Sequence, residues 1–225
     1  KMLSFGIRSY VQVVTAHLLL RIDVYMVQAF LGPSQTAFYA LALHFTELVL
    51  EVPQAIGLVL YPKLAALPEE QMHRLTAQSC RRTLMVTVPA AAALALLGPW
   101  IIVLWYGKAY AEAGAPLPWA AVGVAAMSIF VIITRDFTAR QKQRVNTVSG
   151  LLALATNVAL NVFLIPIYGI VGALFATAVA YSGACVILIY FFLQESGLRW
   201  FDVLVPTRDD VAYFSGVAQR ALARV

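Results

Sequence analysis

The stretch that decides the fold of this chain is AHLLLRIDVYMVQAFLG, residues 16–32, in which two charged side chains interrupt an otherwise apolar run. If this stretch crosses a membrane, Arg21 and Asp23 both lie within the hydrocarbon core. A charged side chain at the centre of a bilayer costs at least ~2.5–3.5 kcal/mol, so such residues are rare and by default indicate a functional site. The rest of the sequence tells whether a membrane surrounds this stretch.

The composition is that of an integral membrane protein. Apolar residues make up 61% of the 225 residues and charged residues 12%, and the mean hydropathy is +0.80. A soluble domain has about 45–50% apolar and about 25% charged residues. The net charge of +5 comes from short clusters between long apolar runs, so no nucleic-acid partner is expected. Cys80 and Cys185 have neither disulfide-framework nor metal-ligand spacing.

Six apolar segments are long enough to cross a ~30 Å hydrocarbon core, which takes about 20 helical residues. Glycine and proline separate them, notably at Gly32, Pro62, Gly107, Pro116 and Gly169. The sequence therefore predicts an all-α integral membrane protein with six transmembrane helices. The predicted spans are 5–31, 35–61, 83–106, 117–135, 148–167 and 169–193.

The basic residues predict an orientation. Every Lys and Arg except Arg21 and Lys108 falls on one side of the six-span arrangement. Because cytoplasmic loops carry the excess of Lys and Arg, that side is predicted to be cytoplasmic, with both termini of the chain on it. We expect a multi-pass protein of the inner, cytoplasmic membrane, in which residues 1–195 form the membrane unit and residues 196–225 a cytoplasmic or interfacial tail.

Two segments on the cytoplasmic side are predicted to lie outside the spans. The connection 63–82 is expected to form a short helix along the membrane surface, where His73 would be solvated. Arg135 and Asp136, where the fourth span meets the cytoplasm, are expected to anchor that end at the interface.

Arg21 and Asp23 cannot pair along a regular helix, because residues two apart point about 200° away from each other. Arg21 belongs to a polar stripe at helical spacing, and a second stripe with steps of three, four and three follows in the next span. We predict that the two stripes line a transport pathway. Its candidate residues are His17, Arg21, Tyr25, Gln28, His44, Glu47, Glu51 and Gln54. The alternative is a structural ion pair of Arg21 with Glu47 or Glu51 that fastens two helices.

Asp23 points away from that stripe, and the fifth and sixth spans offer oxygen ligands that would accompany it. Asn157 and Asn161 share one helix face at i, i+4, and Thr177 follows in the sixth span. Carboxylate, amide, hydroxyl and backbone carbonyl oxygens are the ligands that hard cations prefer, so we predict a Na⁺ site here. Interhelical hydrogen bonding by the asparagines is the alternative. A stripe of small residues predicts close helix packing, at Gly172, Ala176, Ala180 and Ala184.

The sequence has no nucleophile–base arrangement, Cys/His metal cluster or phosphate-binding glycine loop. We therefore assign no catalytic residue, expect no cofactor beyond a coupling Na⁺ or H⁺, and expect a protein that is not an enzyme.

Three stretches resemble one group of transporters. RIDVYMVQAFLGPSQTAFYALALHFTELVLEVPQAIGLVLYPKLAAL, residues 21–67, resembles the seventh and eighth helices of polysaccharide and O-antigen flippases, of the multidrug/oligosaccharidyl-lipid/polysaccharide exporter superfamily. NVALNVFLIPIYGIVGALFATAVAY, residues 157–181, is similar to their eleventh and twelfth helices, and WYGKAYAEAGAPL, residues 105–117, resembles the intervening loop and helix. The features that match in the first stretch are Arg21-x-Asp23, Gly32, Tyr39, Glu51-Val52-Pro53 and Tyr61-Pro62-x-Leu64.

The resemblance implies one lobe, the C-terminal six-helix lobe, of a two-lobe alternating-access transporter. Its partners would be an N-terminal six-helix lobe missing from this sequence, membrane lipids, and a lipid-linked sugar diphosphate as substrate. In the sister family of peptidoglycan-precursor flippases, a cation site lies in the first, fifth and sixth helices of this lobe. By position that site would comprise Asp23, Asn157, Asn161, the Ala173 carbonyl and Thr177. Asn161 stands where that family has an acidic ligand, which lowers the negative charge.

The leading hypothesis is a flippase that moves a lipid-linked oligosaccharide across the cytoplasmic membrane for the synthesis of cell-envelope polysaccharide such as lipopolysaccharide. A cation-coupled multidrug antiporter is an alternative within the superfamily. A membrane-embedded transferase or a structural subunit of the same pathway are alternatives of other classes. A transferase is expected to carry charged motifs at a membrane face, whereas the charges here lie mid-span, and a structural subunit would not explain the long polar stripes.

Overall fold

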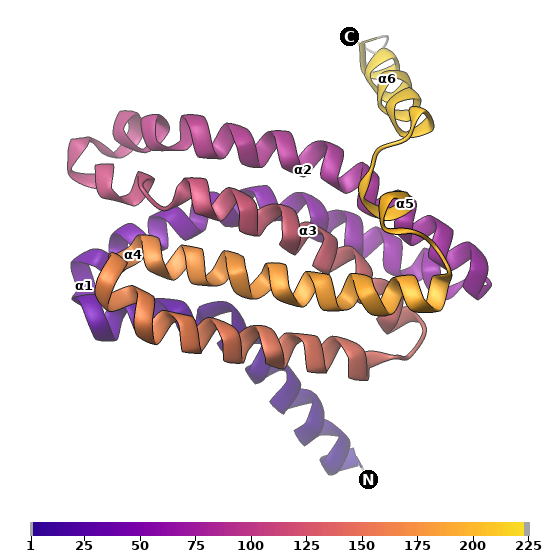
Figure 1. Ribbon diagram of the computed structural model, residues 1–225, viewed down its shortest axis with the longest axis horizontal. Coiled ribbons are helices and arrows are strands. Elements are labelled where there is room, and N and C mark those ends of the chain that lie inside the picture. The colour runs from indigo at the N-terminus through magenta and orange to yellow at the C-terminus, as the bar shows by residue number, and fades with distance from the viewer. Residues whose placement is uncertain (1, 223–225) are drawn as a thin grey trace.

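The computed structural model describes the backbone of residues 2–222 and the side chains of residues 21–216 and 219. Its elements are α1 (Met2–Ala65), α2 (Glu69–Tyr106), the 3-10 helix η1 (Lys108–Gly114), α3 (Leu117–Ala139), α4 (Gln143–Ser196), α5 (Trp200–Leu204) and α6 (Arg208–Leu222). Residues 2–222 contain no β-strand, which confirms the all-α class (Figure 1).

The two longest helices, α1 and α4, are each bent back at one glycine. The 54 residues of α4 would measure about 81 Å if straight, far more than the ~30 Å core of a bilayer. Gly32 in α1 (φ 80°, ψ −178°) and Gly169 in α4 (φ 60°, ψ −141°) have non-helical angles with positive φ, which glycine adopts without the penalty of a Cβ. The two arms of α4 run side by side, as Figure 1 shows and the hydrogen bond from Asn157 to Thr177 requires.

These bends explain how four long helices correspond to six predicted spans. Within the described part of the chain, four helices are long and apolar enough to cross a membrane: Arg21–Ala65, Glu69–Tyr106, Leu117–Ala139 and Gln143–Ser196. The first and the last have two arms each, so six helical segments result, with bends at the glycines expected between spans. One boundary was wrong, because residues 69–82 do not form a separate surface helix but continue without interruption into α2.

The third helix lies at the centre of the bundle, where α3 packs against α1, α2 and α4. Small residues permit this packing: a Cβ on Gly123 of α3 would lie 3.2 Å from the Cα of Ala178 in α4. A Cβ on Gly172 would lie 2.4 Å from the carbonyl oxygen of Leu164 in the other arm of α4. The predicted stripe of small residues is buried along its whole length, which confirms that it serves close helix packing.

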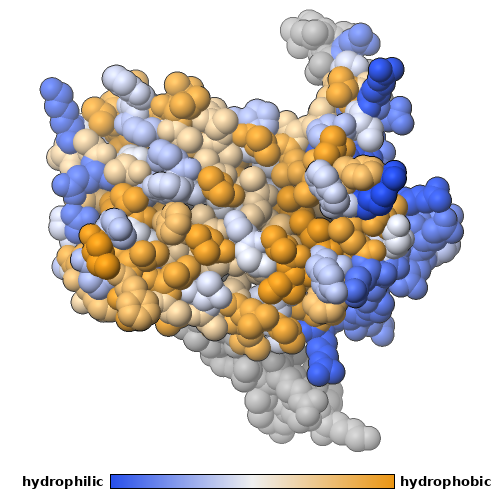
Figure 2. Space-filling model, in the orientation of Figure 1, coloured by the Kyte–Doolittle hydropathy of each residue, from blue (hydrophilic) through white to orange (hydrophobic). Residues whose placement is uncertain are grey.

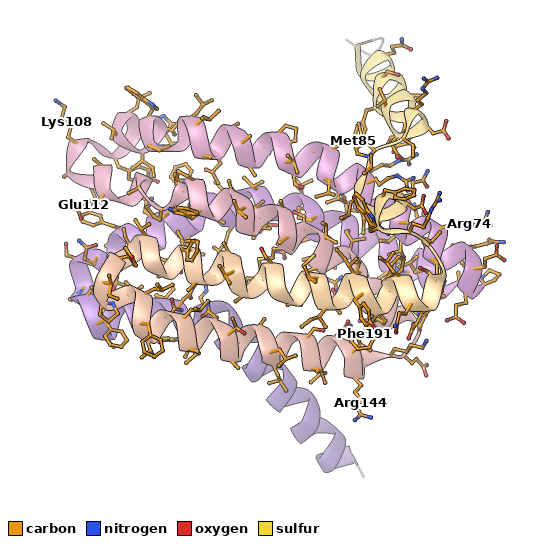
Figure 3. The ribbon with its side chains drawn as sticks, in the orientation of Figure 1. Arg74, Met85, Lys108, Glu112, Arg144 and Phe191 are labelled. Atoms are coloured by element: carbon orange, nitrogen blue, oxygen red, sulfur yellow. The ribbon has the colours of Figure 1, made fainter. Side chains whose placement is uncertain are left out.

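Hydrophilic side chains gather at the ends of the bundle, and apolar residues cover the surface between them (Figure 2). Arg74 and Arg144 lie at the end where α2 begins and α4 ends, whereas Lys108 and Glu112 lie at the opposite end (Figure 3). This separation agrees with the two-sided distribution of basic residues expected from the sequence. The orientation of the bundle in a cell remains a prediction.

The tail is docked on α2 by a buried ion pair. The side chain of Asp210, at the start of α6, is fully buried and accepts hydrogen bonds from Nε of Arg81 at 2.6 Å and Nε of Arg82 at 3.1 Å. The guanidinium of Arg82 also lies over the ring of Tyr213, 3.9 Å from its centre. Val203 of α5 is fully buried in an apolar cluster that also contains Cys80 of α2 and Phe192 of α4. The place of residues 196–225 relative to a membrane stays a prediction.

Candidate cation site and polar pathway

Asp23 is a buried carboxylate in the first arm of α1, with an exposed fraction of 5%. Its Oδ1 accepts a hydrogen bond from the backbone N–H of Val24 at 2.8 Å, and its Oδ2 accepts one from the hydroxyl of Tyr39 at 2.5 Å. The hydroxyl of Thr177, in the second arm of α4, lies 3.5 Å from the same Oδ2. Among the described side chains, Asp23 forms no ion pair, because the guanidinium of Arg21 contacts Glu47 instead. Neutral donors alone therefore hold this carboxylate.

The five residues predicted as cation ligands lie in one continuous chain of contacts. Nδ2 of Asn157 donates to the hydroxyl of Thr177 at 3.0 Å, and Nδ2 of Asn161 donates to Oδ1 of Asn157 at 2.9 Å. The Thr177 hydroxyl lies 3.0 Å from the Ala173 carbonyl. The hydroxyl has one proton, so it donates a hydrogen bond to either this carbonyl or Asp23, but not to both at once. Oδ1 of Asn161 is buried and has no hydrogen-bond partner in the described part of the chain.

This arrangement suits a singly charged ion. It gathers carboxylate, hydroxyl, amide and carbonyl oxygens, as hard cations require. Asp23 contributes the one carboxylate among the five predicted ligands, and one carboxylate balances one positive charge. The hydrogen bond from Asn157 to Thr177 also joins the two arms of α4, so Asn157 has the interhelical role as well, whereas Asn161 bonds to Asn157 within one arm.

Tyr39 belongs to this site, although it is not among the five predicted ligands. It is fully buried and connects the two arms of α1 through its bond to Asp23. The predicted reversal of the chain at Gly32 could have indicated that Tyr39 lies near Asp23. Asp23 lies nine residues before Gly32 and Tyr39 seven residues after it, so a sharp reversal at Gly32 brings the two to similar depths at ~1.5 Å per residue.

A cavity of ≈ 280 Å³ between α1, α3 and α4 borders both the candidate cation site and the polar stripe. Asp23, Asn157 and Thr177 line its buried part, and Tyr181 lies beside them. Arg21, Glu47, Glu51 and Gln54 line its exposed part. The side chain of Arg21 is 49% exposed, whereas Asp23 is 5% exposed. The two side chains differ in burial, as expected for residues on opposite faces of a helix. However, both border the same cavity, whereas the sequence placed Arg21 in the transport pathway and Asp23 in a separate cation site.

The remaining pathway candidates lie apart from the cavity. Tyr25, Gln28 and His44 are exposed and do not line it, and the side chain of His17 falls outside the described residues. Arg21 forms an ion pair with Glu47, one of the two pairs given as the alternative to a pathway, with 3.1 Å between Nη2 and Oε1. Both side chains are more than a third exposed, and pairs of this kind contribute about 0–1 kcal/mol. The pair therefore fastens the two arms only weakly.

A second buried polar cluster was missed. Asp136 is fully buried and accepts hydrogen bonds from the Thr76 hydroxyl at 2.9 Å and from Nε of Arg140 at 2.6 Å. His73 is also buried, and its ring packs against Phe192. The expectation of a solvated His73 was wrong, because α2 begins fourteen residues before the predicted third span and His73 on it packs against Phe192 of α4. Asp136 is buried among protein side chains, and its depth in a membrane stays a prediction. The i, i+4 spacing of Asp136 and Arg140 could have predicted their contact on one helix face.

Comparison with known proteins agrees with these features. Residues 9–211 match the family described as lipid II flippase MurJ. The chain is 24% identical, over 164 residues, to the probable low-salt glycan biosynthesis flippase Agl15 of Haloferax volcanii. That alignment covers 71% of this chain and 35% of Agl15, so the chain spans about a third of the length of this curated relative. No solved structure matches the chain.

These matches confirm the superfamily that the sequence predicted. The matched range includes residues of all six helical segments and every described residue of the cavity. Flippases of this family are transporters and catalyse no chemical reaction, so the prediction that the chain is not an enzyme is confirmed. The chain belongs to the lipid II flippase MurJ family.

Proposed function

We propose that this chain is the C-terminal six-helix lobe of a flippase that moves a lipid-linked oligosaccharide across the cytoplasmic membrane by alternating access. The family supports the class of activity, and the coverage of about a third of Agl15 supports a part of a larger transporter. The exposed polar face of α1, which carries Arg21, Glu47 and Glu51, suits a surface that a second lobe covers. In this arrangement both ends of the segment lie in the cytoplasm.

The substrate is proposed to be a lipid-linked sugar diphosphate used for cell-envelope polysaccharide. The name of the family gives lipid II as cargo, and the name of the relative gives glycan biosynthesis. The cavity of this lobe carries Arg21 against Asp23, Glu47 and Glu51, so its acidic side chains outnumber the basic one. The positive charge that binds a diphosphate must then come mainly from the other lobe, while this lobe serves coupling.

Coupling to a monovalent cation rests on one observation: Asp23 is buried and hydrogen-bonded by neutral groups alone. An ionised carboxylate removed from water without a counter-charge is strongly unfavourable. A Na⁺ among the oxygens of Asp23, Asn157, Asn161, Ala173 and Thr177 supplies that charge, and a proton on Asp23 removes the need for it. Either ion allows the site to alternate between two charge states during transport.

The test uses the complete transporter in proteoliposomes, with a fluorescent lipid-linked oligosaccharide and either a Na⁺ or a pH gradient. Asp23→Asn should abolish the stimulation by the gradient while the protein remains folded. Glu70→Gln is the matched control, because it removes one carboxylate from an exposed pair with Arg74 at the start of α2. Stimulation that persists in Asp23→Asn would contradict coupling at this site. Saturable translocation by the 225-residue chain alone would contradict its role as one lobe.

A further inference from the structure

The cavity that reaches Asp23 carries another carboxylate, Glu51, at its exposed part. Glu51 and Glu47 are four residues apart in the second arm of α1, on one face, and both line the cavity. Glu47 is neutralised by Arg21 at 3.1 Å. Glu51 is exposed and has no ion pair or hydrogen bond among the described side chains. An ionisable side chain in a membrane segment without a partner indicates function.

The two carboxylates that are not paired with Arg21 lie at different parts of the cavity. The free carboxylate of Glu51 lies at the exposed part, and the buried carboxylate of Asp23 lies at the other. Small and apolar residues, among them Ala120, Gly123 and Ala178, also line the cavity. After Arg21 is set against Glu47, the remaining charges of the cavity, Glu51 and Asp23, are both negative. A cleft with an excess of one sign of charge and walls of low dielectric constant focuses the electric field and raises the local concentration of the opposite ion.

We propose that Glu51 admits the monovalent cation: it draws the ion from the polar face of the lobe into the cavity, from which the ion passes inward to the oxygens around Asp23. This inference rests on the cation coupling proposed above and adds the route and the residue that controls it. Glu47 is a poor candidate for the same role, because its charge is balanced by Arg21. Arg21 thereby neutralises Glu47 and leaves the carboxylate of Glu51 free to attract a cation.

The experiment measures Na⁺ binding to the complete transporter in detergent, as the Na⁺ concentration that gives half of the maximal increase in melting temperature. Titrations are made at low and at high ionic strength, the latter set with choline chloride. Glu51→Gln should raise the half-saturating Na⁺ concentration about three- to tenfold at low ionic strength, and the difference should shrink at high ionic strength because salt screens an exposed charge. Glu51→Asp keeps the charge and should behave like the wild type.

Two further variants make the result specific. Glu70→Gln changes the net charge equally but lies outside the cavity, so its titration should match the wild type at both ionic strengths. Asp23→Asn should remove the Na⁺ response altogether. If Glu51→Gln binds Na⁺ like the wild type at low ionic strength while Asp23→Asn does not respond, the role of Glu51 is overturned and the site at Asp23 stands. If the wild type shows no Na⁺ response, this inference is overturned, whereas proton coupling at Asp23 is tested separately by the pH gradient in proteoliposomes.

Discussion

The hydroxyl of Tyr39 donates a hydrogen bond to Oδ2 of Asp23 across the Gly32 bend, with 2.5 Å between the two oxygens. This bond joins the two arms of α1 inside the bundle and fixes the carboxylate against the second arm of α4, where Thr177 lies. A hydroxyl that donates its proton still has lone pairs to offer. Tyr39 can therefore orient the carboxylate and also face a cation bound next to it.

Replacing Tyr39 by Phe tests this relationship. The change leaves a buried carboxylate with one donor fewer, a loss that costs about 1–3 kcal/mol, so the melting temperature should fall and the half-saturating Na⁺ concentration should change. The measurement is a thermal titration of the complete transporter with Na⁺. Tyr25→Phe is the matched control, because Tyr25 lies on the same helix and is 64% exposed. Equal behaviour of the two variants would mean that the hydroxyl of Tyr39 does not support the site.

Cysteine labelling tests the difference in burial between positions 21 and 23. Cys80 and Cys185 are buried, so the native background should be low, and both are replaced by Ala as a precaution. In the resulting protein, Arg21→Cys should react readily with a water-soluble thiol reagent, whereas Asp23→Cys should react slowly. The reaction is followed by the increase in mass in the folded protein and again after denaturation, where both positions should react. Faster labelling at position 23 would show that the burial of these two side chains is reversed.

The bend in α4 depends on a conformation that favours glycine. Gly169 has φ 60° and ψ −141°, and residues with a Cβ in such regions cost of order 1–3 kcal/mol. Gly169→Ala should therefore lower the free energy of unfolding by about that amount, measured by denaturation in mixed micelles. Gly183→Ala is the matched control, because Gly183 lies in the same helix with ordinary angles and open space where a Cβ would be. Its effect should be neutral or stabilising by up to about 1 kcal/mol.

The docking of α6 should depend on the charge of Asp210. Burial raises the pKa of this carboxyl, but hydrogen bonds from Arg81 and Thr207 outweigh burial and lower the pKa from 3.8 to about 2. Because the pKa is lower in the docked state, the stabilisation is fully present above about pH 4 and is lost as the pH falls through about 2. Hydrogen exchange of the amides in residues 208–216 should therefore accelerate over that interval and be constant between pH 5 and pH 8 after correction for intrinsic rates.

A substitution isolates the same contact at neutral pH. Asp210→Asn should raise the exchange rate of those amides at pH 7, because it leaves Arg81 and Arg82 near an uncharged group. Asp209→Asn is the control, since Asp209 is exposed one residue away and should leave the rate unchanged. Unchanged exchange in Asp210→Asn would mean that apolar contacts alone hold α6 in place.

The sequence by itself determined the features that depend on local composition and helical period. Long apolar runs separated by glycine and proline predicted the six helical segments, including the bends at Gly32 and Gly169. The 3.6-residue period placed Asn157 and Asn161 on one face of a helix, and the structure brings both to the same chain of contacts as Thr177. These properties follow from a single helix in an apolar environment, so no knowledge of its neighbours was needed.

Only the tertiary structure decided which faces meet. The contact of Tyr39 with Asp23, the cavity shared by Asp23 and Glu51, and the docking of Asp210 on Arg81 join residues from different arms or helices. Each depends on how far one helix is shifted and rotated relative to the next. Periodicity gives the direction of a side chain about its own axis only, whereas shift and rotation result from the packing of all neighbouring side chains at once.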